Sequence, residues 1–362
     1  MEQLYDLASL TKALCSAPLA LKYLHQNIDD KIVGINGFPI ECKDPFTLKD
    51  LLCHRAGLPA WLPFRTDMSL YEQIVSCKVY GQHALISKGI KGTSLYSDIS
   101  FRFVKDLLES NTMRSYEDLA VEQTGLYHYP WSNIDFNQRL PISQPNAVDE
   151  VAWHIYYENN KPIPDTVQEL PHDINARAGM KGHAGLCGSA KMVKNTLKKW
   201  VDEGYMMKQA VPYSRTEKGQ IWGLGLWVQH YDVPNGFYDL LHSIPINASN
   251  NTDVHIIENN DCCVLDDTIE NIVDISIDNT IESDWWSHSG FTGFFLYVMY
   301  SLLMHSLLSL ILGPTIFVRP KDRMVICVLC NRLDVDHKLL DNNKRKLRIL
   351  KLMKLYVSEI FV

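Results

Sequence analysis

The stretch YDLASLTKALCSAPLALKYL, residues 5–24, places a serine and a lysine three positions apart in an apolar segment. Its apolar pattern predicts a helix over residues 7–28. Positions three apart share one helix face, so Ser9 and Lys12 should project side by side. A lysine whose pKa is lowered by burial and neighbours can take up or relay the serine proton, or stabilise the alkoxide. The simpler interpretation, a helix start with Ser9 as N-cap and Lys12 in solvent, is decided by the rest of the chain.

The overall composition allows the chain to build a sizeable hydrophobic core. The chain has 362 residues, of which 46% are hydrophobic, enough for one large domain or two smaller ones. Its net charge of −7 gives no indication of a nucleic-acid partner. The nine cysteines, an odd number without regular spacing, favour a reducing compartment. Because residues 1–9 lack a basic n-region and an apolar h-region, no signal peptide is predicted, and the chain as written is expected in the cytoplasm unless a targeting signal precedes it.

The order of predicted elements places helices first and strands late. Helices are predicted over residues 48–55, 99–109, 115–125 and 189–205, and a basic amphipathic helix over residues 344–361. Alternating patterns predict strands over residues 221–232, 314–320 and 323–331. This order favours an α/β or α+β fold with a mainly antiparallel sheet.

Two segments interrupt this pattern. Residues 251–284 carry ten acids and no Lys or Arg, so the Asn- and Ile-rich stretch 244–284 is expected to be a disordered, low-complexity insertion. Residues 294–313 carry no charge over twenty positions, a length that could span a bilayer. We expect this run to be a translated intron, with an apolar loop and a true membrane span as the alternatives. A membrane location therefore depends on residues 294–313.

Several motifs occur in an order that resembles one known superfamily. They are Ser9-Leu10-Thr11-Lys12, LLCHRAGLP (51–59), Tyr96-Ser97-Asp98, HDINARAGMKGHAGLCGSA (172–190) and His288-Ser289-Gly290. Together they resemble the serine β-lactamase and penicillin-binding-protein superfamily, in particular its class C-like branch, which also holds esterases and D-amino-acid peptidases. The resemblance covers roughly residues 5–240 and 285–335. It implies an α/β, β-lactamase/transpeptidase-like fold in which a helical lobe lies beside a mainly antiparallel sheet.

The resemblance also implies a domain organisation. A β-lactamase-related hydrolase domain is expected over residues 1–335, interrupted by the insertions 244–284 and 294–313. Residues 336–362 are expected to pack a C-terminal helix on the sheet. Relatives place a helix and two strands before the S-x-x-K helix, so N-terminal elements are expected to be missing and the sheet to expose an edge.

The catalytic roles follow from the same resemblance. Ser9 is expected to be the nucleophile that forms an acyl-enzyme, and Lys12 its proton partner. Tyr96 is expected to share the general acid–base work, with a phenol pKa lowered by nearby cations. The backbone N–H groups of Ser9 and Phe291 are expected to form the oxyanion hole, because donors aimed at the developing charge stabilise the tetrahedral transition state.

The substrate-binding residues implied are Asp98, His288, Ser289 and Gly290. Asp98 stands where the family often has Asn, and it is expected either to hold Lys12 protonated or to contact substrate. His288 stands where many relatives carry Lys, and a neutral histidine fixes a substrate carboxylate less well. The expected substrate is therefore a small-molecule ester, amide or peptide rather than a β-lactam. The alternative is a catalytically inactive scaffold or binding protein on the same fold, which could be membrane-associated.

No metal or organic cofactor is expected. His172, Asp173 and His183 could suggest metal ligation, but their spacing and irregular surroundings do not match a zinc site. No Walker-type G-K-S/T follows the glycines of residues 179–188, so these glycines predict a structural turn rather than a phosphate-binding loop.

Overall fold

The computed structural model describes part of the chain. The described residues are 4–24, 28–30, 32, 46–62, 64–76, 96–130, 171, 173–211, 213–215, 221–228, 254–258, 286–289, 315–319 and 324–329.

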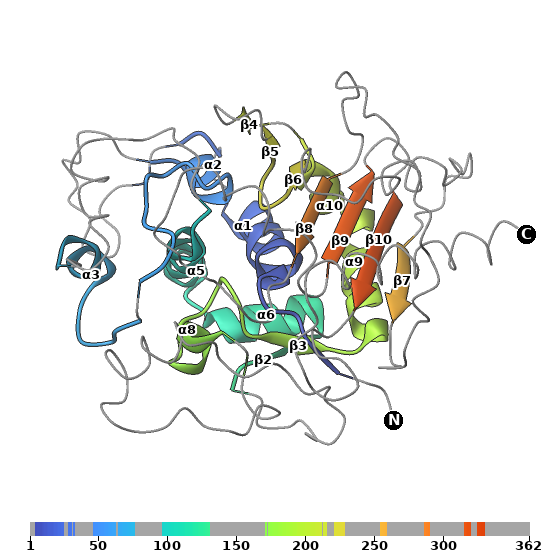
Figure 1. The fold of residues 1–362 in the computed structure, drawn as a ribbon, viewed down its shortest axis with the longest axis horizontal. Coiled ribbons are helices and arrows are strands. Elements are labelled where there is room, and N and C mark those ends of the chain that lie inside the picture. The colour runs from blue at the N-terminus through green and yellow to red at the C-terminus, as the bar shows by residue number, and fades with distance from the viewer. Residues whose placement is uncertain are drawn as a thin grey trace, which may run out of the picture.

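A seven-stranded sheet forms one side of the described structure (Figure 1). Its strands, in spatial order, are β4 (Ser214–Arg215), β5 (Ile221–Trp222), β6 (Trp227–Val228), β8 (Trp286–Ser289), β9 (Thr315–Arg319), β10 (Met324–Leu329) and β7 (Val254–Glu258). Neighbours pair antiparallel, apart from the parallel pair β10 and β7. The predicted mainly antiparallel sheet is therefore confirmed. A second, three-stranded sheet has the order β1 (Tyr5–Asp6), β3 (Leu186–Gly188), β2 (Tyr127–His128).

Helices make up the rest of the described structure. They are η1 (Lys12–Ser16), α1 (Ala17–Tyr23), α2 (Leu48–Leu52), α3 (Leu70–Ser76), α5 (Asp98–Thr112), α6 (Tyr116–Thr124), α8 (Ile174–Arg177), α9 (Ala190–Asp202) and α10 (Tyr205–Gln209). In Figure 1, η1 and α1 lie at the centre, between the sheet and helices α2, α5 and α6. The helical lobe expected beside the sheet is thus present.

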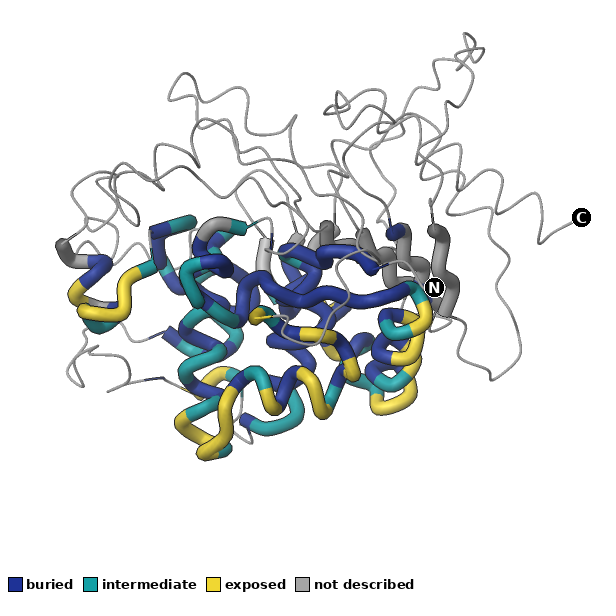
Figure 2. The backbone as a smooth tube through the Cα atoms, turned by 90° about the horizontal axis from the view of Figure 1, so that it is seen from below, coloured by how far each residue is buried: buried dark blue, intermediate teal, exposed yellow. Residues whose placement is uncertain are grey.

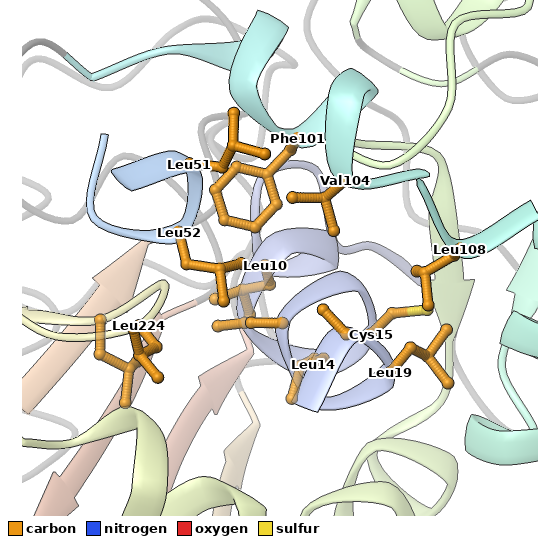
Figure 3. Packing of buried hydrophobic residues seen from close by; sticks show 14 of the residues in the cluster. Leu10, Leu14, Cys15, Leu19, Leu51, Leu52, Phe101, Val104, Leu108 and Leu224 are labelled. Atoms are coloured by element: carbon orange, nitrogen blue, oxygen red, sulfur yellow. The ribbon is translucent and has the colours of Figure 1, made fainter. Parts of the chain in front are cut away.

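The central helix, made of η1 and α1, is buried over residues 10–20. Leu10 and Leu14 have no exposed surface, and they pack among Leu52, Phe101 and Val104 (Figure 3). Each such side chain contributes about 1.5–3 kcal/mol on burial. Exposed segments lie on the outer helices and turns instead (Figure 2). The start of this helix, where Ser9 lies, is therefore fixed by the main core.

Side-chain caps explain where the helices begin. In α2, Thr47 and Asp50 form a capping box. The hydroxyls of Ser97, Ser115 and Ser189 accept the first N–H groups of α5, α6 and α9. The first helix differs from its predicted span, because α1 ends at Tyr23 and the preceding turns are a π-helix.

The segment predicted as one strand over residues 221–232 forms a hairpin within its described part. β5 and β6 pair antiparallel, with Trp222 opposite Trp227. Gly225 turns the chain with φ +81°, a conformation that favours glycine, and its N–H donates to the carbonyl of Leu52 at 3.0 Å. The prediction of a single strand is wrong because the two glycines between the tryptophans make a tight turn.

Strand β7 lies inside the acidic segment that was expected to be disordered. It pairs in parallel with β10, with Val254 opposite Val325. The expectation of disorder is therefore wrong for these five residues. The rest of residues 244–284, the run 294–313 and the C-terminal segment 336–362 lie outside the described residues. Within the part that is described, no helix is both long and apolar enough to cross a bilayer.

Candidate active site

Ser9 lies in the turn that joins β1 to the central helix. The Asp6 carboxylate accepts the N–H of Ala8 at 2.9 Å, and Ala8 takes the left-handed conformation with φ +43°. The N–H of Leu7 donates to the carbonyl of Leu186 at 2.9 Å, which ties the turn to β3. A non-glycine residue with positive φ is uncommon and is held here by these bonds. The turn leaves Ser9 partly exposed at the N-terminal end of a buried helix.

Lys12 lies next to Ser9 and is fully buried. Its Nζ donates to Ser9 Oγ at 2.9 Å and to the carbonyl of His183 at 3.0 Å, and it forms an ion pair with Asp98 Oδ1 at 2.8 Å. An ammonium group has three N–H donors and no acceptor, so three oxygen partners suit the protonated form. The arrangement therefore presents a cation to the Ser9 hydroxyl.

The pKa of Lys12 supports the same protonation state. Burial by itself lowers it, but the charges of Asp98 and Tyr96 and their hydrogen bonds outweigh burial, and the pKa is raised above 10.5. The lowered pKa that would let Lys12 act as a base by itself is therefore not what its surroundings favour, because the Asp98 carboxylate opposes the effect of burial. The expectation that Asp98 holds Lys12 protonated agrees with this geometry.

Tyr96 completes the group of three side chains expected to do the chemistry. Its hydroxyl is hydrogen-bonded to Lys12 and Ser9. Lys12 Nζ also lies 5.0 Å from the centre of its ring. Burial and the charge of Asp98 raise the pKa of the Tyr96 phenol and outweigh the cation of Lys12. The expected lowering of this pKa is therefore wrong, although the expected proximity of the three side chains is what the structure has.

Asp98 is the first residue of α5, directly after its N-cap Ser97. The Ser97 hydroxyl, and not Asp98, caps this helix, because it accepts the N–H of Ser100 at 3.1 Å. With that cap in place, the Asp98 carboxylate is available to Lys12. A contact between Asp98 and substrate stays a prediction.

A second pair of ionisable groups lies behind Lys12, and sequence reasoning assigned it no catalytic role. Nε2 of the fully buried His183 lies 2.8 Å from Asp173 Oδ1. That carboxylate also accepts the N–H of Ala176 at 2.8 Å. Burial alone would raise the pKa of Asp173, but His183 and these hydrogen bonds hold it well below its usual range. The pair fixes the loop whose His183 carbonyl accepts the Lys12 ammonium.

Asp98, Asp173 and His183 are the described residues that could hold a metal ion. Their ligand atoms lie within 4.8 Å of one another. Lys12 pairs with Asp98, however, and His183 with Asp173, at 2.8 Å in each case. We therefore assign Asp98 to an ion pair with Lys12, and Asp173 and His183 to a hydrogen-bonded pair, rather than to a metal centre.

The glycine-rich segment is a structural turn, as predicted, and it brings His183 against the helix. Gly179, Gly182 and Gly185 all have positive φ. The side chain of Ser16, one turn after Lys12, donates to the carbonyl of Gly182 at 2.5 Å. Two successive carbonyls of the turn are thus held by two side chains of the π-helix. Such irregular helical turns are frequent at functional sites.

Replacing Gly182 with alanine should destabilise this turn. A Cβ built there would lie 2.4 Å from the backbone oxygen of Phe101, and φ is +94°. We expect a loss of about 2–4 kcal/mol in the free energy of unfolding from the clash and the unfavourable φ. Denaturant unfolding measures it, with Gly204→Ala as the control, because Gly204 has a similar φ of +80° and open space at its Cβ. Equal losses in the two variants would contradict the close-approach argument.

The predicted motif His288-Ser289-Gly290 is described only in part. His288 and Ser289 end β8, where they pair with Ile316 and Thr315 of β9. Only the backbone of this strand is described. Gly290 and Phe291 lie outside the described residues, so the oxyanion hole and the roles of His288, Ser289 and Gly290 stay predictions.

The chain matches one family model and resembles several solved structures. A family model described as Beta-lactamase matches residues 1–351, whereas no curated protein matches the chain. A class C beta-lactamase from Rhodobacter sphaeroides is 15% identical, with a TM-score of 0.51; the match covers 100% of this chain and 86% of that one. An octameric penicillin-binding protein homologue from Pyrococcus abyssi is 13% identical, with a TM-score of 0.44; the match covers 89% of this chain and 60% of that one. A D-amino acid amidase from Ochrobactrum anthropi is 16% identical, with a TM-score of 0.41, covering 64% of this chain and 67% of that one.

Proposed function

Since the chain belongs to the beta-lactamase family, whose members are serine hydrolases, we propose that it hydrolyses a small ester, amide or peptide through an acyl-enzyme on Ser9. The observation that carries the proposal is the contact of Lys12 Nζ with Ser9 Oγ at 2.9 Å, with the Tyr96 hydroxyl bonded to both. A nucleophile within hydrogen-bond reach of its proton partners is the arrangement that covalent catalysis requires.

The proposed proton path starts from protonated Lys12 and protonated Tyr96, because the pKa values of both groups are raised. Ser9 Oγ attacks the acyl carbon while its proton passes to Lys12, and Lys12 releases a proton to Asp98 at 2.8 Å. Lys12 thus stays an ammonium beside the developing charge, and Asp98 stores the proton. When the carbonyl re-forms, that proton returns through Lys12 and Tyr96 to the leaving oxygen or nitrogen. Water then repeats the sequence on the acyl-enzyme and restores Ser9.

The charge balance favours neutral substrates. In the described part of the site, the cation that contacts Ser9 is Lys12, and its charge is matched by Asp98. The Asp173 carboxylate adds negative charge nearby, because it interacts electrostatically with Lys12. An anionic penicillin would find little attraction there. We therefore propose an esterase or small amide or peptide hydrolase rather than a dedicated β-lactamase.

A specific observation favours a second candidate, the inactive scaffold or binding protein. The pKa values of Lys12 and Tyr96 are both raised. Lys12 and Tyr96 therefore both keep their protons near neutral pH. Catalysis then depends on the transfer of a proton from Lys12 to the Asp98 carboxylate. Without that transfer, the same constellation would be a satisfied polar cluster in a protein that binds and does not turn over.

The two candidates separate in a hydrolysis assay of the full chain. A p-nitrophenyl ester, a D-aminoacyl amide and a penicillin are compared, each with the Ser9→Ala variant as control. We expect Ser9-dependent turnover of the ester or the amide, at least about tenfold faster in kcat/KM than of the penicillin. Penicillin as the best substrate would overturn the proposed substrate class. No Ser9-dependent turnover of any of them by folded protein would favour the scaffold.

Replacing Asp98 with asparagine tests the proton store through pH. Asp98 raises the pKa of Lys12, while burial lowers it. Without the carboxylate, burial is less opposed, so Lys12 should lose its proton at a lower pH and become a base itself. We expect the pH profile of acylation to move to lower pH in Asp98→Asn. An unchanged profile would show that Asp98 does not control the ionisation of Lys12.

A further inference from the structure

The segment that follows α2 holds the start of α5 in place. The backbone N–H of Ser97 donates to Nδ1 of His54 at 2.9 Å. The Ser97 hydroxyl donates to the carbonyl of Pro59 at 2.6 Å, and the N–H of Asp98 donates to the carbonyl of Ala60 at 2.9 Å. Three hydrogen bonds, two to the LLCHRAGLP motif and one to Ala60 directly after it, therefore hold the tripeptide that carries two of the site's ionisable groups. Of the three acceptors, the His54 ring is the one that a substitution can remove.

The hydrogen bond to Ser97 fixes the state of the His54 ring. A backbone N–H can only donate, so Nδ1 must carry its lone pair. The proton of the neutral imidazole then lies on Nε2. His54 is only 2% exposed, and a single tautomer is thus held inside the core.

The same ring packs against Tyr96. The two ring centres lie 4.5 Å apart with an interplanar angle of 33°. Trp222 meets the imidazole edge-on at 4.8 Å, and Phe101 lies at 5.3 Å. Such aromatic pairs favour defined geometries. The His54 ring therefore restricts where the Tyr96 ring can lie, and it also accepts the hydrogen bond from the N–H of Ser97.

The backbone of His54 has an unfavourable conformation for a residue with a side chain. Its φ is +56°, directly after Cys53, the C-cap of α2. Glycine is the usual residue at this position after a helix, because a side chain is disfavoured there. Strained backbone that persists in a structure clusters at functional sites. A histidine where glycine would be easier indicates that the ring is needed.

We propose that His54 is a positioning residue: its Nδ1 acceptor and its ring hold Tyr96 and Asp98 in register with Ser9 and Lys12. This inference rests on the proposed function and adds a residue that does not touch substrate. The LLCHRAGLP motif thereby gains a physical role, which is to assemble the second half of the catalytic group.

A pair of near-isosteric substitutions separates positioning from packing. In His54→Asn, the side-chain oxygen can take the place of Nδ1 and accept the Ser97 N–H. In His54→Gln, the longer side chain carries its oxygen toward the place of Nε2 and loses that bond. His54→Ala removes both the acceptor and the ring. Leu197→Ala, a buried residue of α9, controls for a general loss of core packing.

The first readout is the acylation of the full chain by a fluorophosphonate, resolved into probe affinity and maximal rate. We expect His54→Ala and His54→Gln to lower the maximal rate by about tenfold or more, with probe affinity within about threefold of the unsubstituted chain. His54→Asn should recover most of the rate, and Leu197→Ala should keep it. Equal rates in His54→Asn and His54→Gln, both folded, would overturn the positioning role and leave the proposed function standing. Because these two variants decide the outcome, the proposal does not depend on His54→Ala folding.

A second readout does not need an active enzyme. The Tyr96 phenol is titrated by absorbance difference between each variant and the same variant carrying Tyr96→Phe. Burial raises the pKa of Tyr96, so release of the ring should lower it toward 10 in His54→Gln and less in His54→Asn. If the unsubstituted chain is not labelled, the proposed function fails and this titration alone decides the inference. An unchanged Tyr96 titration in His54→Gln would then overturn it.

Discussion

Replacing Lys12 with methionine should slow the acylation of Ser9 by about a thousandfold or more, because the cation that faces the nucleophile and carries its proton is lost. It should also destabilise the fold. Asp98 would lose its ion-pair partner at 2.8 Å, and its side chain is only 16% exposed. Breaking such a pair from one side costs about 3 kcal/mol. The labelling rate with a fluorophosphonate and the free energy of unfolding in denaturant measure the two effects.

A double substitution tells these two effects apart. In Lys12→Met with Asp98→Asn, the unpaired charge is gone, so most of the lost stability should return. Acylation should stay slow, because neither asparagine nor methionine can move the proton. If Lys12→Met alone is as stable as the unsubstituted chain, the ion pair is not the buried interaction that its geometry indicates.

Replacing Tyr96 with phenylalanine should lower the acylation rate by about 10²–10⁴, the usual contribution of a general acid–base group. The ring stays, so its packing on His54 at 4.5 Å is kept. The free energy of unfolding should therefore change by only about 1 kcal/mol, the worth of a hydrogen bond. Tyr96→Phe should therefore slow acylation with little loss of stability, whereas Lys12→Met should reduce both.

The matched control for the Tyr96 hydroxyl is Tyr205→Phe. Tyr205 begins α10, is partly buried and packs edge-on against Trp200. Its substitution removes the same hydroxyl from another tyrosine and should leave acylation unchanged. A Tyr96→Phe chain that is labelled as fast as this control would remove Tyr96 from the proton path.

The local pattern predicts that Ser9 and Lys12 lie side by side, whereas their roles came from the family resemblance. The spacing of Ser9 and Lys12 predicts adjacent side chains, and the two lie 2.9 Å apart although the helix continues as a π-helix. The helices predicted over residues 115–125 and 189–205 also form, and each begins one residue later than predicted, after a serine N-cap. The prediction that Tyr96 lies beside Ser9 and Lys12 came from the family resemblance and not from hydrophobic periodicity.

The remaining features depend on contacts between distant segments. The carbonyl that accepts the Lys12 ammonium belongs to His183, 171 positions away in the sequence. The direction of the pKa shifts at Lys12 and Tyr96 depends on how burial competes with Asp98, a balance that residue types alone do not determine. For the same reason, Asp173 and His183 could be named as possible ligands but not as the pair behind Lys12.

Strand pairing also limits how much of the sheet can be predicted from the sequence. Alternation predicts strands over residues 314–320 and 323–331, and both form. The edge strand Val254–Glu258 lies in an acidic, Asn-rich context that masks its short apolar core. Pairing with β10 gives this segment its hydrogen bonds, which a propensity argument over one segment does not include.

The most direct test of the account is the position of a covalent adduct. The full chain is treated with a fluorophosphonate, digested, and mapped by mass spectrometry, with Ser9→Ala treated in parallel. The account predicts a single adduct on the peptide that contains Ser9, and none in the variant. An adduct on another residue, or no adduct on folded protein, would contradict the assignment of Ser9 as the nucleophile.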